Sequence, residues 1–273
     1  YVNGFYYAYR IIIESVKAKI QKLGILYDKK YDVFPVVNNY LLKDYFLSPH
    51  SEAIRHIKIK SNILDIGCND GGLGNKLIEE KQCNVTGLEI NKSQLKYNLN
   101  KFYNCDLDKD LPEINYNHID NIIMLDVIEH LKNPEEFMDK LYSKVSTNDK
   151  VEILISTPNI SFFLIRFMLF FGFFNYGKRG ILDKTHTRLF TFSSFSKLIL
   201  GANFKILSVK GIPAPFPLAV GSNLFSNSLL NLNKFLIYFF KSFFSYQIFM
   251  KIKPNLSLEL LLNKAKEKAS LIK

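Results

Sequence analysis

The feature that most constrains the fold is a regular alternation of short apolar runs with helical patterns between residues 61 and 157. Helices are predicted over residues 73–80, 93–99 and 134–145. Strands are predicted for NILDI (62–66), NVTGLEI (84–90), a short segment near Lys101 to Asn104, HIDNIIMLD (118–126) and VEILIST (151–157). Alternation of this kind implies an α/β fold whose parallel strands are joined by right-handed crossovers. Ligands of such sheets bind beyond the carboxyl ends of the strands.

The flanking segments have other patterns. An amphipathic helix is predicted over residues 5–23, and a short helix near Tyr40 to Phe46. After Pro158 the alternation stops, and it resumes with a helix (192–200), a strand (204–212), a helix (229–244) and a last strand (246–252). We therefore expect three parts: an N-terminal helical cap (1–60), an α/β domain (61–253) with an aromatic insertion (159–183), and a basic helical tail (254–273).

Cysteine spacing and the length of the apolar runs indicate the cellular location of the protein. The three cysteines form no CxxC pair and no zinc-type spacing, which favours a reducing, cytoplasmic location. No leader peptide is recognisable. The longest apolar run, Phe162 to Phe174, is interrupted by Arg166 and is shorter than the roughly 20 residues that span a bilayer, although it could lie in an interface.

The net charge of +11 indicates which kinds of partner the protein could bind. It would attract anionic surfaces, and we name an anionic membrane surface as a candidate partner. Nucleic acid is not expected as a partner, because no arginine-rich patch or RNA-binding signature accompanies the charge. The oligomeric state stays open.

Acidic side chains stand where strands of the predicted sheet end. Asp65 precedes a turn that contains Gly67, Asn69 and Gly71. Carboxylates also close or follow the next three strands, at Glu89, Asp106 and Asp126. An acidic edge suits a ligand with hydroxyls, an amine and a positive centre. A dinucleotide site would need glycine at position 69, and the neighbouring Asp70 would repel a pyrophosphate, which argues against a nicotinamide-dependent oxidoreductase.

These motifs carry a family resemblance. In their order and spacing, ILDIGCNDGG, GLEIN, NCDL and NIIMLDVIEHLKNP resemble the cofactor-binding motifs of class I S-adenosylmethionine-dependent methyltransferases, over residues 62–159. STPN and DKTHTRLFT extend the similarity to about Lys253, most closely to ubiquinone-pathway O-methyltransferases and methyltransferases of glycan gene clusters. The resemblance implies a Rossmann-like sheet of seven mostly parallel strands, the last one antiparallel, with helices on both faces and S-adenosyl-L-methionine as cofactor.

The resemblance also implies roles for individual residues. Glu89 would bind the ribose, and Asp126 would lie at the end of the cofactor cleft. The complete predicted cofactor set is Gly67, Cys68, Asn69 and Gly71 around the methionine part, Glu89 at the ribose, Asp106 and Leu107 at the adenine, Asp126 at the end of the cleft, and Asp65. Asn69 replaces the family's usual glycine, and Asn tolerates a left-handed backbone.

Two histidines are the candidate catalytic residues. A hydroxyl acceptor benefits from a general base, and we assign this role to His130 and His186, which lie next to the expected cleft. No metal is expected as the leading interpretation. One alternative is a quinone-type O-methyltransferase with Mg²⁺ held by Asp126, Glu129 and His130. The other is a nucleoside-binding scaffold without catalysis.

The acceptor is a small molecule, a sugar or a lipid-linked glycan precursor, and oxygen is the expected methyl acceptor. The aromatic insertion is interpreted as a hydrophobic lid over the acceptor, with simple core packing as the alternative. His50, His56 and His118 are interpreted as surface or structural residues.

Overall fold

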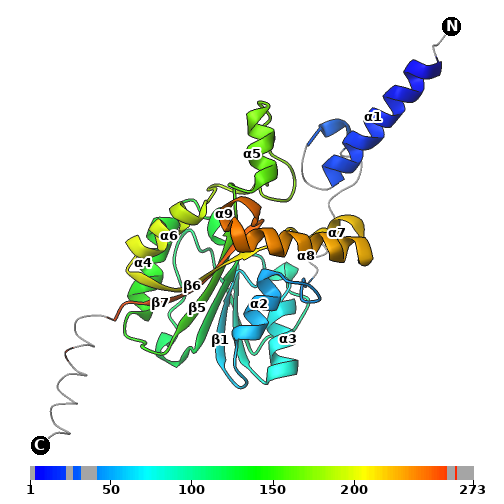
Figure 1. Cartoon of the computed structure of the whole chain (residues 1–273). Coiled ribbons are helices and arrows are strands. Elements are labelled where there is room, and N and C mark those ends of the chain that lie inside the picture. The colour runs from blue at the N-terminus through cyan, green and yellow to red at the C-terminus, as the bar shows by residue number, and fades with distance from the viewer. Residues whose placement is uncertain (1–3, 23–26, 32–41, 257–261, 263–273) are drawn as a thin grey trace, which may run out of the picture.

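The computed structural model describes residues 4–22, 27–31, 42–256 and 262. Its centre is one sheet with the strand order β3-β2-β1-β4-β5-β7-β6 (Figure 1). Strand β7 is antiparallel to both of its neighbours, while the pairs from β3 to β5 are parallel. The strands are β1 (Asn62–Ile66), β2 (Asn84–Glu89), β3 (Lys101–Asn104), β4 (Asn121–Leu125), β5 (Glu152–Pro158), β6 (Phe204–Ile212) and β7 (Gln247–Pro254). The predicted fold class, with an antiparallel last strand, is confirmed.

Helices cover both faces of the sheet (Figure 1). Helices α2 and α3 pack on one face, and α4 and α6 pack on the other. The α-helices are α1 (Gly4–Lys22), α2 (Pro49–His56), α3 (Gly72–Lys81), α4 (Pro134–Val145), α5 (Phe163–Phe170), α6 (Phe192–Gly201), α7 (Phe216–Val220), α8 (Leu224–Phe239) and α9 (Lys241–Phe244). Within the part of the chain that the structure describes, no helix is both long and apolar enough to cross a membrane.

The buried strands divide their apolar side chains between two cores. In β1, Ile63 packs with α2 and α3, while Leu64 and Ile66 pack with α4 and α6. In β4, Ile122 and Ile123 follow the same rule. Successive residues of a strand point to opposite faces, so a strand that is covered on both faces needs a continuous apolar run. This is the pattern that predicted these strands.

The prediction of a helix over residues 93–99 is wrong. Only the single 3₁₀ turn η2 (Lys92–Gln94) forms, and the chain then runs without helix to β3. The helical spacing of Leu95 and Leu99 has another cause, because both side chains pack against the glycines of the first turn and of the neighbouring helix and strand. The backbone N–H groups of Lys96 and Tyr97 donate to the carbonyl of Asp70 instead of continuing a helix.

The N-terminal side of the sheet also differs from the prediction. Residues 42–46, the described part of the helix predicted near Tyr40, are not helical. The helix of this region is α2, which begins after Ser48. The Ser48 hydroxyl accepts a hydrogen bond from Ser51 N–H at 3.1 Å, and Pro49 occupies the first helical position. A Ser-Pro start followed by Ser51 and Glu52 is a recognisable capping signal, so the start of this helix could have been predicted from the sequence.

Two further boundaries move for similar reasons. Strand β4 begins at Asn121, because residues 116–118 form the 3₁₀ turn η3 (Tyr116–His118). The helix predicted over residues 229–244 begins earlier, at Leu224, where Asn223 and Ser226 form a capping box, and it breaks at Phe240 before α9. The aromatic insertion contains α5. The tail predicted as a helix lies outside the described residues, apart from 254–256 and 262.

Candidate functional site

The strand order brings the predicted carboxylates to one edge of the sheet. Asp65 pairs in register with Gly87 on β2, and Glu89 pairs with Asn104 on β3. The N–H of Cys105 donates to the Glu89 carbonyl at 3.0 Å, so the chain that carries Asp106 leaves the sheet beside Glu89. Asp126 follows β4 on the other side of β1. All four acidic side chains therefore come from four neighbouring strands, β3, β2, β1 and β4.

The turn between β1 and α3 has left-handed backbone at three positions. The φ angles are 72° at Gly67, 49° at Asn69 and 82° at Gly71. The N–H groups of Gly67 and Cys68 donate to the carbonyl of Leu88 at 2.8 and 3.1 Å, which holds the turn against β2. A side chain on Gly67 would place its Cβ 2.5 Å from a methyl group of Val127. Glycine is therefore required at position 67 by backbone conformation and by space.

Glu89 holds this turn from the second strand. One carboxylate oxygen accepts from Asn69 N–H at 3.0 Å, and the other accepts from Ile90 N–H at 2.8 Å. A carboxylate has about four acceptor positions. Two positions therefore remain for a ligand, which matches the two hydroxyls of a ribose.

Asp65 is the buried carboxyl beneath the turn. It is 4% exposed, and its Oδ2 has no hydrogen-bond partner among the residues that the structure describes. Burial, and secondly the charge of Glu89, raise the pKa of Asp65 to about 7. A buried oxygen without a partner is costly. The cationic amine of an amino-acid ligand supplies the kind of group that would satisfy it.

Asp106 and Leu107 lie in the turn after β3. One oxygen of Asp106 accepts from Asp108 N–H at 3.2 Å, and the other pairs with Lys109 at 3.2 Å. Asp106 and Leu107 line a cavity of about 180 Å³ together with Lys132 and Phe137. Two further cavities, of about 490 and 310 Å³, lie beside α6 and at the amino ends of β1 and β2. Gly67 and Glu89 line none of these three cavities.

Asp126 ties three strands together. Its Oδ1 accepts from the Ser156 hydroxyl at 2.8 Å, and its Oδ2 accepts from the Gln247 amide at 2.6 Å. Both carboxylate oxygens are thus engaged by β5 and β7. This arrangement does not favour the magnesium set of Asp126, Glu129 and His130, because Asp126 would have to give up these contacts.

The two predicted catalytic histidines lie against each other. Their ring centroids are 4.8 Å apart, with an edge-to-face angle of 71°. His130 Nδ1 lies 3.2 Å from the carbonyl oxygen of Thr185, and His186 Nδ1 lies 2.9 Å from that of Ile181. A carbonyl only accepts hydrogen bonds, so each neutral ring carries its proton on Nδ1 and offers Nε2 as an acceptor. Burial is the main cause that lowers the pKa of His186, which keeps its ring neutral at pH 7.

Glu129 is a buried carboxyl group next to His130 and His186. It is 1% exposed, and neither carboxylate oxygen makes a hydrogen bond within the described ranges. Burial, followed by the charge of Asp126, raises the pKa of Glu129 well above its usual range. Donor atoms of Glu129, His130 and His186 lie within 4.8 Å of one another, so these three residues, rather than Asp126, are the group that could hold a cation.

His50 also lies near the carboxyl end of β4, which was not predicted from the sequence. His50 is buried at the start of α2, and its Nδ1 accepts from Lys43 N–H at 3.3 Å. Burial is the main cause that lowers the pKa of His50 to about 4, while the carboxylate of Asp126 acts in the opposite direction. The capping signal of α2 could have placed His50 at the start of a helix, but the contact of this helix with β4 depends on tertiary packing.

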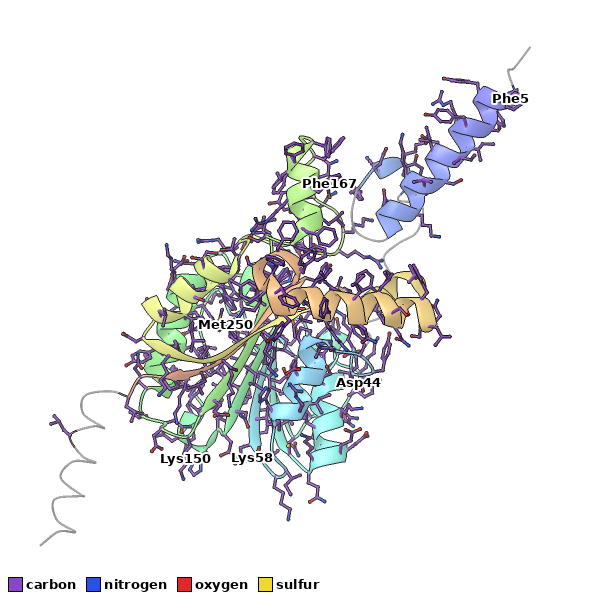
Figure 2. All side chains as sticks on the ribbon, viewed as in Figure 1. Phe5, Asp44, Lys58, Lys150, Phe167 and Met250 are labelled. Atoms are coloured by element: carbon purple, nitrogen blue, oxygen red, sulfur yellow. The ribbon has the colours of Figure 1, made fainter. Side chains whose placement is uncertain are left out.

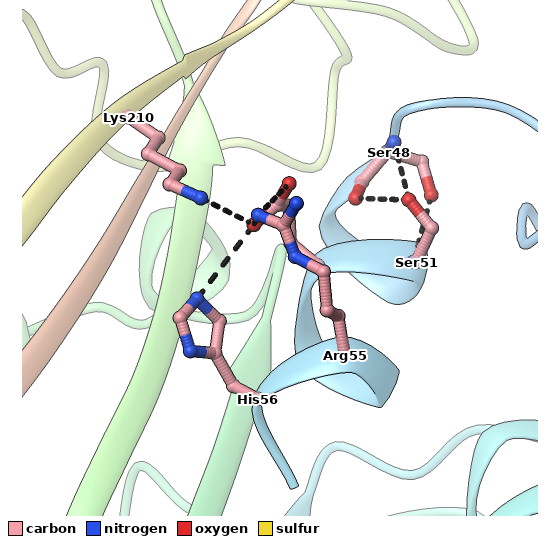
Figure 3. Close-up of polar contacts among 6 residues, drawn as sticks. Ser48, Ser51, Arg55, His56 and Lys210 are labelled. Atoms are coloured by element: carbon pink, nitrogen blue, oxygen red, sulfur yellow. Dashed lines mark hydrogen bonds and ion pairs between the residues drawn. The ribbon is translucent and has the colours of Figure 1, made fainter.

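Helix α2 is fixed over the sheet by a charge cluster (Figure 3). Glu52 is 3% exposed and pairs with Lys210 of β6 at 3.0 Å. Arg55 also pairs with Glu52, and His56 Nε2 lies 3.7 Å from it. The ring of His56 stacks on Phe249 of β7. These contacts join α2, the helix that carries His50, to the strands β6 and β7.

The strand order and the antiparallel last strand are those that the resemblance to class I S-adenosylmethionine-dependent methyltransferases implied for the fold. Residues 40–209, more than half of the chain, match the family described as "Methyltransferase domain". The chain belongs to this methyltransferase-domain family.

Relatives and solved structures agree with this assignment. The chain is 36% identical over 97 residues to (S)-tetrahydroprotoberberine N-methyltransferase of Eschscholzia californica, a match covering 31% of this chain and 27% of that protein. It is 36% identical over 93 residues to a probable counterpart of Papaver bracteatum, covering 31% and 26%. The matches span about a quarter of these relatives. A methyltransferase structure from Archaeoglobus fulgidus shares the fold, with a TM-score of 0.51 and 19% identity over 74% of this chain and 89% of that one.

Proposed function

We propose that this chain transfers a methyl group from S-adenosyl-L-methionine to a small-molecule, sugar or lipid-linked glycan acceptor, with oxygen as the receiving atom. The observation that carries the proposal is the meeting of Asp65, Glu89 and the left-handed turn at adjoining strand ends. An unsatisfied buried carboxyl and a carboxylate with spare acceptor positions suit the amine and the ribose of this cofactor.

The residues that would hold the cofactor follow from these fits. The turn of Gly67, Cys68, Asn69 and Gly71 would contact the methionine part, and Cys68 itself is buried there. Glu89 would hold the ribose, Asp106 and Leu107 the adenine, and Asp65 the amine. Asp126 would form the wall of the site next to β4. When bound, the cofactor supplies an electrophilic methyl group on a sulfonium.

His130 and His186 would remove the proton of the acceptor. Both rings offer Nε2 as an acceptor, and each ring is oriented by a backbone carbonyl. General-base catalysis contributes about 10² to 10⁴-fold to such a step, and orientation of the acceptor contributes further. Because partial burial lowers the pKa of His186, we expect protonation of this ring to reduce activity only at a pH below the ordinary range of histidine.

A nitrogen acceptor is the second candidate. The matched proteins of Eschscholzia and Papaver are named as N-methyltransferases, which supports an amine in place of a hydroxyl. A primary or secondary amine also loses a proton when the new N–CH₃ bond forms, so the same histidine pair would serve; a neutral tertiary amine has no N–H and would need no base.

The test is methyl transfer by the purified chain, with a labelled methyl group and a panel of hydroxyl and amine acceptors. We expect turnover with one acceptor class, and a loss of about 10² to 10⁴-fold in His130→Ala and His186→Ala with unchanged cofactor affinity. Full turnover in both variants would contradict the catalytic assignment. Cofactor binding without turnover on any acceptor would favour the scaffold alternative.

A further inference from the structure

Three segments outside the sheet expose large apolar side chains on one side of the molecule. They are α1 (residues 4–22), residues 160–184, which contain α5 and all but the first residue of the aromatic insertion, and residues 213–246 with α7, α8 and α9; together we call them the aromatic surface. Phe170 on α5 and Tyr238 on α8 are each 83% exposed, and Phe5 on α1 is 91% exposed. Figure 1 shows α1, α5 and α8 at the same end of the molecule, and in Figure 2 Phe5 and Phe167 lie opposite to Lys58 and Lys150.

Exposure on this scale is unusual for a surface that only faces water. Single exposed apolar residues are normal, but patches larger than a few hundred Å² mark sites of interaction. On α8, Phe235 and Phe239 are 60% and 59% exposed, their ring centroids are 5.1 Å apart, and Phe240 beyond them is 63% exposed. Phe167 on α5 and Phe171, the residue after this helix, repeat this arrangement with ring centroids 4.8 Å apart. The exposed rings therefore form clusters.

The charge of the aromatic surface identifies what covers it. Its three segments contain ten Lys and Arg residues and two acidic residues, a net charge of +8 out of +11 for the whole chain. Residues 213–246 contain no acidic residue. A second copy of this chain would bring an equal positive charge against the first, which opposes self-association. The charge therefore favours a negatively charged partner.

The arrangement of cations and rings is that of a membrane interface. The guanidinium of Arg166 lies 5.4 Å from the ring centroid of Phe243, and Lys241 Nζ lies 5.6 Å from that of Phe192. Cations beside apolar rings can extend to lipid headgroups while the rings enter the boundary of the acyl chains. Helix α5 has eight residues, which at 1.5 Å per residue is long enough to enter this boundary but not to cross it.

We propose that the aromatic surface binds the surface of an anionic lipid bilayer, with α5 and α8 inserted at the level of the headgroups. This inference goes beyond the methyl-transfer activity and stands without it. The insertion also leads into the loop in which the Ile181 carbonyl orients His186. A chain seated in this way would present its catalytic histidines towards acceptors at the membrane surface.

Flotation of the full chain with vesicles tests the proposal. We expect the chain to float with vesicles of phosphatidylcholine and phosphatidylglycerol, to float much less with phosphatidylcholine alone, and to be released partly by salt. Absence of flotation with the anionic vesicles would overturn the proposal.

Matched variants assign the binding to the aromatic surface. Arg179→Glu with Lys234→Glu, and separately Phe170→Ser with Tyr238→Ser, change exposed side chains. The charge variant should lower the affinity by more than about tenfold, since each basic residue near an anionic surface contributes about fivefold. The controls at the opposite end are Lys58→Glu with Lys150→Glu, and Ile59→Ser, whose side chain is 72% exposed.

Two outcomes would contradict the assignment. Equal loss in the control variants would show that net charge alone causes binding. If light scattering shows a dimer that the Phe170→Ser and Tyr238→Ser changes convert to a monomer, without any lipid binding by the chain, the aromatic surface is a contact between copies. Circular dichroism of each variant verifies that the fold is retained.

Discussion

Glu89 combines a structural and a functional role at one side chain. It accepts hydrogen bonds from two backbone N–H groups of the neighbouring turns and keeps two acceptor positions that the proposed cofactor could use. The position of Glu89 was predictable, because it closes an apolar strand at a fixed distance after the glycine turn. The position of His50 was not, because it reaches this edge only through α2, whose packing depends on the distant Lys210 and Phe249.

Replacing Glu89 should weaken the cofactor site. Glu89→Ala removes the two remaining acceptor positions and leaves Asn69 N–H without its partner. Hydrogen bonds to charged groups contribute about 1.5–3 kcal/mol each, so the dissociation constant of S-adenosylhomocysteine should rise by about 10²-fold in calorimetry. Glu79→Ala on the exposed face of α3 is the control. Equal affinities of the two variants would show that Glu89 does not contact the ligand.

Asp65 should make the free protein less stable as the pH rises. Its folded pKa of about 7 lies above the ordinary value of 3.8, so the unfolded chain releases this proton first. The stability from the protonated form is complete below about pH 4 and is lost as the pH rises to about 7. Asp65→Asn removes this contribution, which is on the order of 4 kcal/mol.

Denaturant unfolding at about pH 4 and pH 8 measures this difference. The free energy of unfolding of Asp65→Asn should fall less over this range than that of the wild type, while the exposed Asp139→Asn should behave like the wild type. An identical fall in Asp65→Asn and the wild type would mean that Asp65 is ionised in the folded protein.

Helix boundaries could be predicted where a capping residue marks the start of the helix. The prediction over residues 93–99 was wrong because tertiary packing causes the spacing of its apolar side chains. Helix α4 has the predicted bounds, because Asn133 caps it and its apolar residues face the sheet. The spacing of Leu95 and Leu99 also had a helical period, but glycines at positions 71, 74 and 87 leave space that these side chains fill from an irregular segment. Periodicity alone does not distinguish these two cases.

The turn between β1 and α3 gives a testable prediction. Gly67 and Gly172 have similar left-handed φ angles of 72° and 78°, but only Gly67 faces a close neighbour, whereas nothing lies within 4 Å of a Cβ on Gly172. Gly172→Ala should therefore cost about 1–2 kcal/mol of backbone strain. Gly67→Ala should cost about 1–3 kcal/mol more through its contact with Val127.

The double variant Gly67→Ala with Val127→Ala separates the two causes. It should recover part of the extra loss, as measured by the free energy of unfolding in a double-mutant cycle. Costs that are equal at Gly67 and Gly172, with no recovery in the double variant, would show that the turn is not tightly packed against Val127.

For the whole molecule, the topology of the sheet brings four separate sequence motifs to one edge of the sheet. Residues that are distant in the chain, from Asp65 to Asp126, meet because β1 lies between β2 and β4. The sequence alone predicted this meeting, since parallel strands align their carboxyl ends. It did not predict how the helices α1, α5 and α8 are placed relative to one another, because amphipathic patterns do not specify this placement.

A crystal structure of the chain with S-adenosylhomocysteine is the most direct test of the site. We expect the ligand beside Gly67, with its ribose hydroxyls on Glu89, its adenine next to Asp106 and its amine near Asp65. A ligand bound elsewhere, or no binding at saturating concentration, would contradict the assignment of the strand ends as the cofactor site.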